Sequence, residues 1–106
     1  MSNTKIDLNT AMVGKYCIIR GKDFGVFAGT VETVEGDRVL LKDARRLWYW
    51  DGAASLSQLA AEGVKNPGDC KFTVTVERVV LIGVIEIIPA TEQAKAIIDE
   101  VRVWKR

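Results

Sequence analysis

The least ordinary stretch of this sequence is Arg45–Ser55, where arginine, aromatic and small residues follow one another. Trp48, Tyr49 and Trp50 include two of the three tryptophans of the chain. Alternate side chains of an extended strand point to the same face, so Trp48 and Trp50 are expected to form one wall of a pocket. Aromatic walls of this kind stack nucleic-acid bases, and each stacked base contributes about 1–3 kcal/mol.

The residues on either side of the tryptophans have the chemistry of a phosphate site. Arg45 and Arg46 can each form paired hydrogen bonds to a phosphate. Because neighbouring strand residues have opposite parity, only one of them should face a ligand, and the other should be a solvated charge. Backbone amides after Gly52, at the start of an expected helix, would donate N–H groups to a second phosphate. The candidate ligand-binding residues are Arg45, Arg46, Trp48, Tyr49, Trp50, Gly52, Ala53, Ser55, Ser57 and, from the first hairpin, Phe24.

A purely structural interpretation of the same residues stays open. Tryptophans in small β-domains most often belong to the core or to a subunit interface. Ser55 fits a helix cap without any ligand. We favour a binding site because aromatic residues, arginines and small residues converge in one segment.

Residues for catalysis are scarce. The chain has no histidine, which removes the commonest general base and metal ligand and every Ser-His or Cys-His pair. No phosphate-binding glycine loop occurs, and the two cysteines, Cys17 and Cys70, lack the close partners of a zinc site. We therefore expect a protein that is not an enzyme and that uses no cofactor or metal. A carboxylate- and metal-assisted phosphodiesterase remains a rival hypothesis.

Composition indicates one folded domain. The 106 residues are 48% hydrophobic and 27% charged, which suits a single core. A net charge of +1 argues against a partner of long nucleic acid. The chain shows neither a membrane-spanning apolar stretch nor a secretion signal, so a cytoplasmic location with free thiols is expected.

Runs of β-branched and aromatic residues between turn signals predict five strands. These are Lys15–Arg20, Val26–Val34, Arg38–Ala44, Lys71–Val80 and Val84–Ile88. In the fourth strand Phe72, Val74 and Val76 alternate with polar residues, which is typical of a half-buried strand. The fifth strand is almost wholly apolar, which favours a central position in the sheet.

Two short helices are expected beside these strands. Ser55 and Gln58 have the spacing of a capping box, and Gly63 suits the end of that helix. Thr91 can cap a second helix whose apolar stripe packs on the sheet. The predicted fold is mainly β (α+β), a small antiparallel sheet, curled or barrel-like. Residues 1–14 are predicted to form a loose N-terminal arm, and residues 15–106 a single β-rich domain.

The segment Ala44–Ala60, together with Glu62–Val64 and Glu86–Pro89, resembles a family of small proteins encoded by tailed phages and prophages. The likeness extends over about Gly14–Arg106. In general character such proteins are similar to the sponges that sequester cyclic nucleotide signals of CBASS and Thoeris defences. The resemblance implies a homo-oligomeric phage protein in the host bacterial cytosol that binds a small nucleotide and blocks host anti-phage defence.

An alternative function uses the same residues. Tryptophan, tyrosine and arginine also dominate the hot spots of protein interfaces. The chain is then a phage interaction or assembly protein that docks on a host or virion protein through its aromatic surface.

Overall fold

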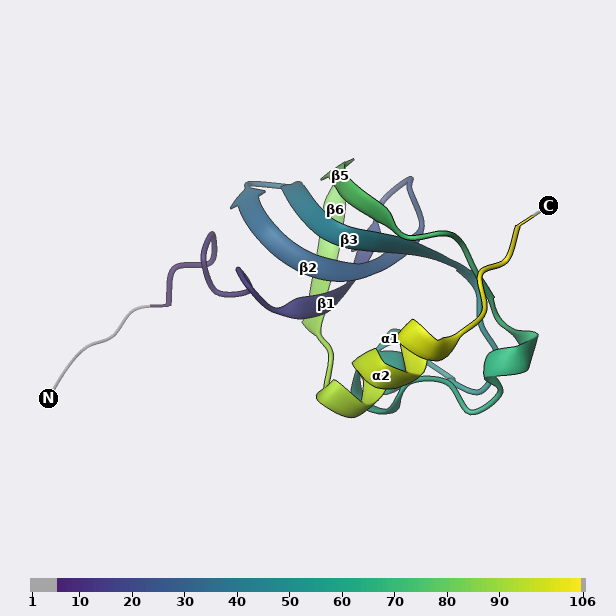
Figure 1. The fold of residues 1–106 in the computed structure, drawn as a ribbon. Coiled ribbons are helices and arrows are strands. Elements are labelled where there is room, and N and C mark those ends of the chain that lie inside the picture. Colours follow the sequence, from purple (N-terminus) through teal and green to yellow (C-terminus); the bar gives the residue numbers. More distant parts are fainter. Residues whose placement is uncertain (1–5, 106) are drawn as a thin grey trace, which may run out of the picture.

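The computed structural model describes residues 6–105 and shows one curled antiparallel sheet with two helices packed against it (Figure 1). In chain order the described elements are β1 (Tyr16–Gly21), β2 (Val26–Glu35), β3 (Arg38–Tyr49), α1 (Leu56–Glu62), the 3-10 turn Pro67–Asp69, β4 (Lys71–Phe72), β5 (Val76–Ile82), β6 (Val84–Pro89) and α2 (Glu92–Glu100). The predicted mainly β fold is confirmed, with six strands instead of five among the described residues.

The strand order is β4-β3-β2-β1-β6, and β5 pairs with the first half of β3. The long strand β3 therefore has two partners on one edge, β5 along Arg38–Ala44 and β4 at Leu47 and Tyr49. Only Gly83 separates β5 from β6 in the chain, yet within residues 6–105 no hydrogen-bonded pairing joins these two strands. The sheet curls without closing into a barrel.

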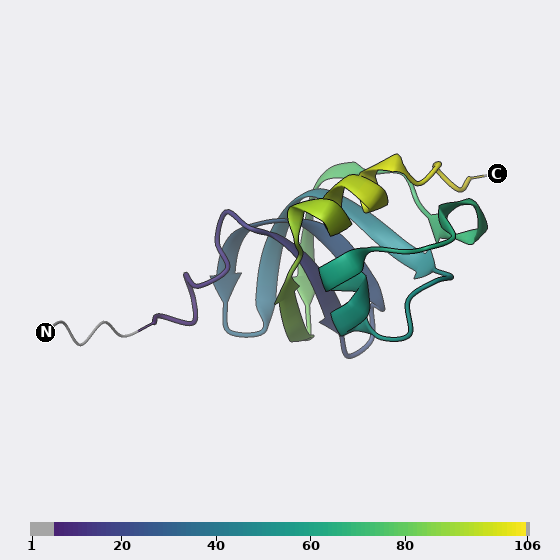
Figure 2. The same ribbon diagram turned by 90° about the horizontal axis from the view of Figure 1, so that it is seen from below.

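The sheet has an apolar cluster on each face. The helix-side core combines Ile18 of β1 and Leu47 of β3 with Leu59 of α1 and Ile98 of α2. The inner core, inside the curl, is formed by residues such as Ile19, Val31, Leu41 and Leu81. Alternation along β1 sends Ile18 to one cluster and Ile19 to the other. Figure 2 shows both helices over the same end of the sheet, which leaves the other end uncovered.

The two helices begin where the capping residues predicted. The Ser55 hydroxyl accepts a hydrogen bond from the Gln58 amide at 3.1 Å, and Gln58 Oε1 accepts from the Ala54 amide at 2.8 Å. Thr91 Oγ1 accepts from the Ala94 amide at 3.0 Å and donates to the carbonyl of Ala61 at 2.8 Å, which ties the start of α2 to the end of α1.

The predicted strand Lys71–Val80 is wrong as a single element. The chain forms β4 over Lys71–Phe72, leaves the sheet, and returns as β5 at Val76. Phe72 is buried as predicted, but Val74 and Val76 are exposed. The reason lies in β3, which exchanges β5 for β4 just beyond Asp43, a non-glycine residue with a φ of 50°. One straight strand cannot follow both halves of β3 across that irregularity.

The predicted central position of Val84–Ile88 is also wrong. Among residues 6–105, strand β6 pairs with β1 alone and forms an edge of the sheet. Three of its four Val and Ile residues are explained by the two cores, because Ile88 packs on the helix-side core while Val84 and Ile87 pack on the inner core, whereas Ile85 is exposed. A strand with apolar residues on both faces is therefore covered on both faces of the sheet, but it does not need a neighbouring strand on each edge.

The predicted N-terminal arm, residues 1–14, lies partly outside the described residues. Residues 8–14 form turns, and the Gly14 amide donates to the Val31 carbonyl at 2.8 Å. Met12 packs against the inner core. The boundary at residue 14 stays a prediction. No helix among residues 6–105 is long and apolar enough to cross a membrane.

Candidate functional site

The end of β3 and the turn between β1 and β2 enclose an open hollow of about 570 Å³. Arg46, Leu47, Trp48 and Trp50 line it from the β3 side. The wall opposite consists of Asp23, Phe24, Gly25 and Val26. The hollow has the volume of a typical small-molecule site, about 300–1,000 Å³. We take it as the candidate site and call it the aromatic hollow.

The two tryptophans have different settings in the aromatic hollow. Trp48 and Trp50 both line this hollow, together with Leu47 of opposite strand parity, and Trp50 lies just beyond the end of β3. Trp48 is 64% exposed, whereas Trp50 is partly buried and packs against the helix-side core. Trp50 is therefore a fixed part of the wall, and the indole of Trp48 presents a free face for stacking.

Arg46 is the cation of the aromatic hollow. Its guanidinium lies over the Phe27 ring, with the central carbon 4.3 Å from the ring centroid, and Nη1 donates a hydrogen bond to the Phe24 carbonyl. These contacts hold the guanidinium in place. The other N–H groups of Arg46 have no acceptor among residues 6–105, so they are available to an anion.

Arg46 also borders a second hollow of about 250 Å³. This hollow is lined by Ala44 and Arg46 of β3 and by Thr73 and Val74 of the segment that precedes β5. The guanidinium-bearing residue therefore separates two recesses that follow one another along β3. A ligand longer than one base would find further room on the far side of Arg46.

Arg45 has a structural role that the sequence did not predict. It is 5% exposed and donates from Nε to the Thr73 carbonyl at 2.8 Å and from Nη1 to the Ile98 carbonyl at 2.7 Å. Nη2 donates to the carbonyl of Val101. Burial lowers the pKa of this guanidinium. The expectation that the second arginine would be a solvated charge is wrong, because Arg45 joins β3 to α2 and to the residues after β4.

The segment Gly52–Ser57 does not line the aromatic hollow. Gly52 has a φ of 98°, and a Cβ there would lie 2.4 Å from the Lys65 amide nitrogen. The close approach that glycine permits is thus made by the chain itself and not by a ligand. The Ala54 amide donates to Gln58, and Ser55 caps a helix of only seven residues. The predicted phosphate cradle at Gly52, Ala53, Ser55 and Ser57 therefore has no support in the geometry.

Tyr49 is 51% exposed but does not line the aromatic hollow. Of the residues singled out in the sequence, the structure brings together Phe24, Arg46, Trp48 and Trp50. Sequence reasoning missed Asp23, whose carboxylate group is the acidic member of the lining. Its nearness to the tryptophans follows from the pairing of Phe27 with Arg46, a register that no local pattern reveals.

The chemistry of this arrangement suits binding. The lining offers two indoles, one phenyl ring, one guanidinium and one carboxylate. Within residues 6–105 no group of three histidine, cysteine, aspartate or glutamate side chains could hold a metal ion. A flat, electron-rich ligand with a negative charge would match both the rings and the guanidinium.

Fold and hollow together define a small β-rich domain, an open curled sheet that carries two short helices on one face and an aromatic hollow at the end of its longest strand. The family model of DUF6948, a domain of unknown function, matches residues 14–98, and the chain belongs to this family. The match includes all the strands described within residues 6–105 and reaches into α2. No curated protein and no solved structure matches the chain.

Proposed function

We propose that this protein is a non-catalytic binding protein that takes a small nucleotide in the aromatic hollow. The observation that carries the proposal is the placement of Arg46 next to Trp48 and Trp50 in one open hollow. Base stacking on an indole contributes about 1–3 kcal/mol and needs no particular base. A guanidinium beside the stacked base adds charge-assisted hydrogen bonds to a phosphate.

In this mode each lining group has one task. The base stacks on the exposed face of Trp48, with Phe24 on the opposite wall. The phosphate meets the N–H groups of Arg46 that point to no protein acceptor among the described residues. Asp23 accepts a hydrogen bond from a ribose hydroxyl or a base amino group.

The biological role that we propose is sequestration of a cyclic nucleotide immune signal. The protein would be phage-encoded, act as a homo-oligomer in the host cytosol, and block a defence of the CBASS or Thoeris type. Support comes from the resemblance to phage proteins, from the absence of histidine, and from a hollow that offers stacking and charge without a nucleophile–base pair.

The test is a thermal-shift screen of the purified protein against cyclic dinucleotides, cyclic ADP-ribose isomers and linear nucleotides. Ligand at 100 times its dissociation constant adds about 2.7 kcal/mol of stability, which raises the Tm of a domain of this size by several degrees. Chromatography of ligand released by denaturation then shows whether it is intact. Recovery of a degraded ligand would replace the proposal with an enzymatic function.

Two neighbouring exposed aromatic residues provide a matched pair of variants. Trp48→Ala should abolish the ligand-induced shift, because it removes the stacking face. Tyr49→Ala should leave the shift unchanged, because Tyr49 is similarly exposed but lies outside the aromatic hollow. An equal loss in both variants, or a shift that survives Trp48→Ala, would rule out this site.

A second candidate function is supported by the exposure of Trp48 and Tyr49, two successive residues at the end of β3 that are 64% and 51% exposed. Exposed aromatic residues are characteristic anchors of protein interfaces. A protein partner would use both side chains, so both alanine variants should lose it in a pull-down. Absence of any nucleotide response together with that result would favour the interaction protein.

A further inference from the structure

The end of the sheet that the helices leave uncovered has an apolar surface. Val80 and Ile82 of β5 are 59% and 66% exposed, and Leu40 of β3 lies directly beside Val80 in the strand register. Thr33 of β2 is paired with Leu40 and completes the surface. We call these four residues, Thr33, Leu40, Val80 and Ile82, the β5 surface. Adjacent exposed apolar side chains on a folded domain mark a contact site.

Strand β5 is also an open edge. It pairs with β3 on one side, and within residues 6–105 no strand pairs with its other side. Natural edge strands are usually protected by lysine, proline, an inward charge or a bulge. The run Val79–Ile82 contains none of these residues. The backbone groups of this edge are therefore ready to accept another strand.

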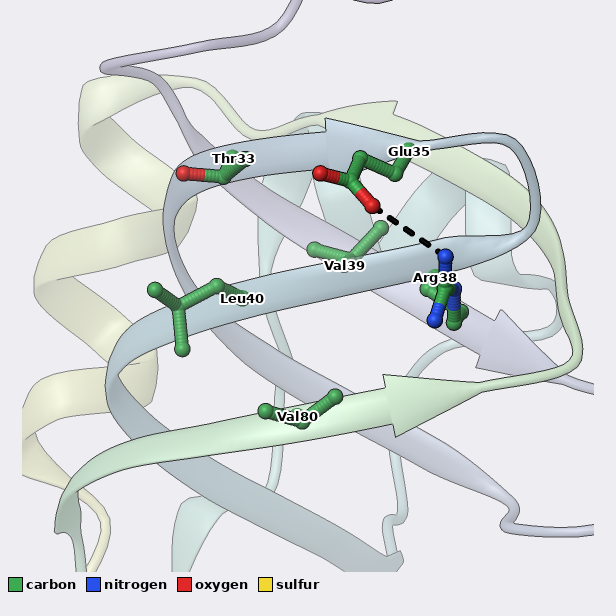
Figure 3. A pocket seen from close by; sticks show the side chains of 6 residues that line it. All are labelled: Thr33, Glu35, Arg38, Val39, Leu40 and Val80. Carbon is green, nitrogen blue, oxygen red and sulfur yellow. Dashed lines mark hydrogen bonds and ion pairs between the residues drawn. The ribbon is translucent and has the colours of Figure 1, made fainter.

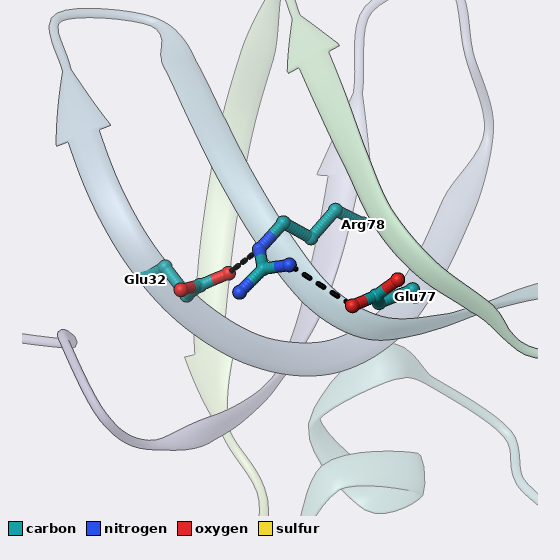
Figure 4. Close-up of polar contacts among 3 residues, drawn as sticks. All are labelled: Glu32, Glu77 and Arg78. Atoms are coloured by element: carbon teal, nitrogen blue, oxygen red, sulfur yellow. Dashed lines mark hydrogen bonds and ion pairs between the residues drawn. The ribbon is translucent and has the colours of Figure 1, made fainter.

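Charges around the β5 surface are compensated within the chain. Arg78 forms ion pairs with Glu32 at 2.7 Å and with Glu77 at 3.1 Å, as Figure 4 shows. Arg38 pairs with Glu35 at 3.1 Å (Figure 3). A different partner with a complementary charge would gain little from a surface whose charges are already paired. With Lys42, which is the strand neighbour of Arg78, these side chains comprise three positive and three negative charges, so an identical copy meets no net charge and little like-charge repulsion across paired strands.

The shape of the β5 surface is compatible with itself. A shallow recess of about 210 Å³ lies over Leu40, Val39 and Val80, with the Glu35–Arg38 pair at its end (Figure 3). Ile82 projects beside this recess, since its Cα partner in the sheet is Arg38. Across a two-fold axis near Val80, antiparallel pairing of the two β5 strands sets Val80 beside Val80 and Ile82 of each copy beside Arg78 of the other, so both copies use the same patch.

We propose that a second copy of this chain docks on the β5 surface, with the two β5 strands side by side and antiparallel about a two-fold axis. Val80 lies near the middle of the interface, and Ile82 of each copy lies beside Arg78 of the other. This inference does not depend on nucleotide binding, because the β5 surface and the aromatic hollow share no residue.

The test is the mass of the protein in solution, measured by sedimentation equilibrium over a dilution series. The full chain should have twice the mass of one chain at high concentration. Val80→Lys and Val80→Glu should each weaken the dimer at least about tenfold, because they place like charges near the axis. An equimolar mixture of these two variants should restore a dimer, which also shows that both are folded.

Ile85→Lys is the matched control, because Ile85 is 54% exposed and lies on the other edge strand, β6. This variant should keep the dimer of the unchanged chain. Three outcomes would overturn the proposal: a monomer at every concentration, a dimer that Val80→Lys leaves intact, or a dimer that only Ile85→Lys disrupts.

Discussion

Two adjacent arginines on β3 have opposite roles. Arg45 points to the helix side of the sheet, where carbonyl groups at the end of α2 and beyond β4 accept its hydrogen bonds. Arg46 points to the inner side, lies on the Phe27 ring, and borders the aromatic hollow. The residue type and the strand are the same. What differs is whether a helix covers that face, and this decides whether an arginine supports the fold or is available to a ligand.

The helix side can hold a buried guanidinium because it offers oxygen acceptors in the right place. The carbonyls of Ile98 and Val101 lie at the C-terminal end of α2, where the helix dipole is negative, and the Ile98 carbonyl accepts the Val101 amide as well as Arg45. Arg45 satisfies these carbonyls, and they replace the water that the guanidinium loses.

Among the variants that test this comparison of Arg45 with Arg46, Arg45→Met is expected to change the free energy of unfolding most. This change removes the hydrogen bonds to Thr73, Ile98 and Val101 and should reduce the free energy of unfolding by about 3–5 kcal/mol. Arg46→Met loses one hydrogen bond to the protein and should cost about 1 kcal/mol. Urea unfolding followed by far-UV circular dichroism measures both. Equal costs would contradict the division between the two faces.

The segment after Trp50 extends this contrast between structural and ligand-accessible residues, because Gly52 packs against Lys65 of the same chain and does not line the aromatic hollow. Gly52→Ala should destabilise the fold by about 2–3 kcal/mol, since it combines a positive φ with a Cβ 2.4 Å from the Lys65 nitrogen. Gly36→Ala is the control, with a positive φ but no atom within 4 Å of its Cβ, and should cost only about 1 kcal/mol. Similar decreases in Tm for the two variants would show that the close packing at Gly52 adds nothing to the cost of its positive φ.

The two tryptophans of the aromatic hollow should separate stability from binding. Trp50→Ala should cost about 2 kcal/mol, because Trp50 packs against the helix-side core. Trp48→Ala should change the free energy of unfolding by less than about 0.5 kcal/mol, because its side chain is mostly exposed. The measurement is chemical unfolding of both variants without ligand. A large loss of stability in Trp48→Ala would make Trp48 a structural residue.

The smallest effect concerns alkaline pH. Burial raises the pKa of the Cys17 thiol to about 11, and it also raises the pKa of the Tyr16 hydroxyl and of the Cys70 thiol. The unfolded chain releases these protons at lower pH, so stability is complete below about pH 8.5 and falls as pH rises toward 11. Tm measured from pH 7 to 11 should show this decline, and Cys17→Ala should flatten part of it. A Tm that rises over this range would contradict the assignment.

Local patterns along the chain were sufficient for much of the fold. Hairpin turns and β-branched runs predicted β1, β2 and the start of β3, and the hydroxyls of Ser55 and Thr91 predicted both helix starts. These features depend on residues within a few positions of one another. Closeness in the sequence also put Trp48 and Trp50 in one segment, and both line the aromatic hollow.

Long-range contacts decided the rest. The sequence by itself determined a small β-rich domain with an aromatic segment beside two arginines. Only the tertiary structure placed α2 over Arg45, used Gly52 for contact with Lys65, and brought Asp23 to the tryptophans through the pairing of β2 with β3. The physical reason is that strand register and helix placement depend on burial summed over the whole sheet. A short sequence motif carries information only about residues close to it in the chain.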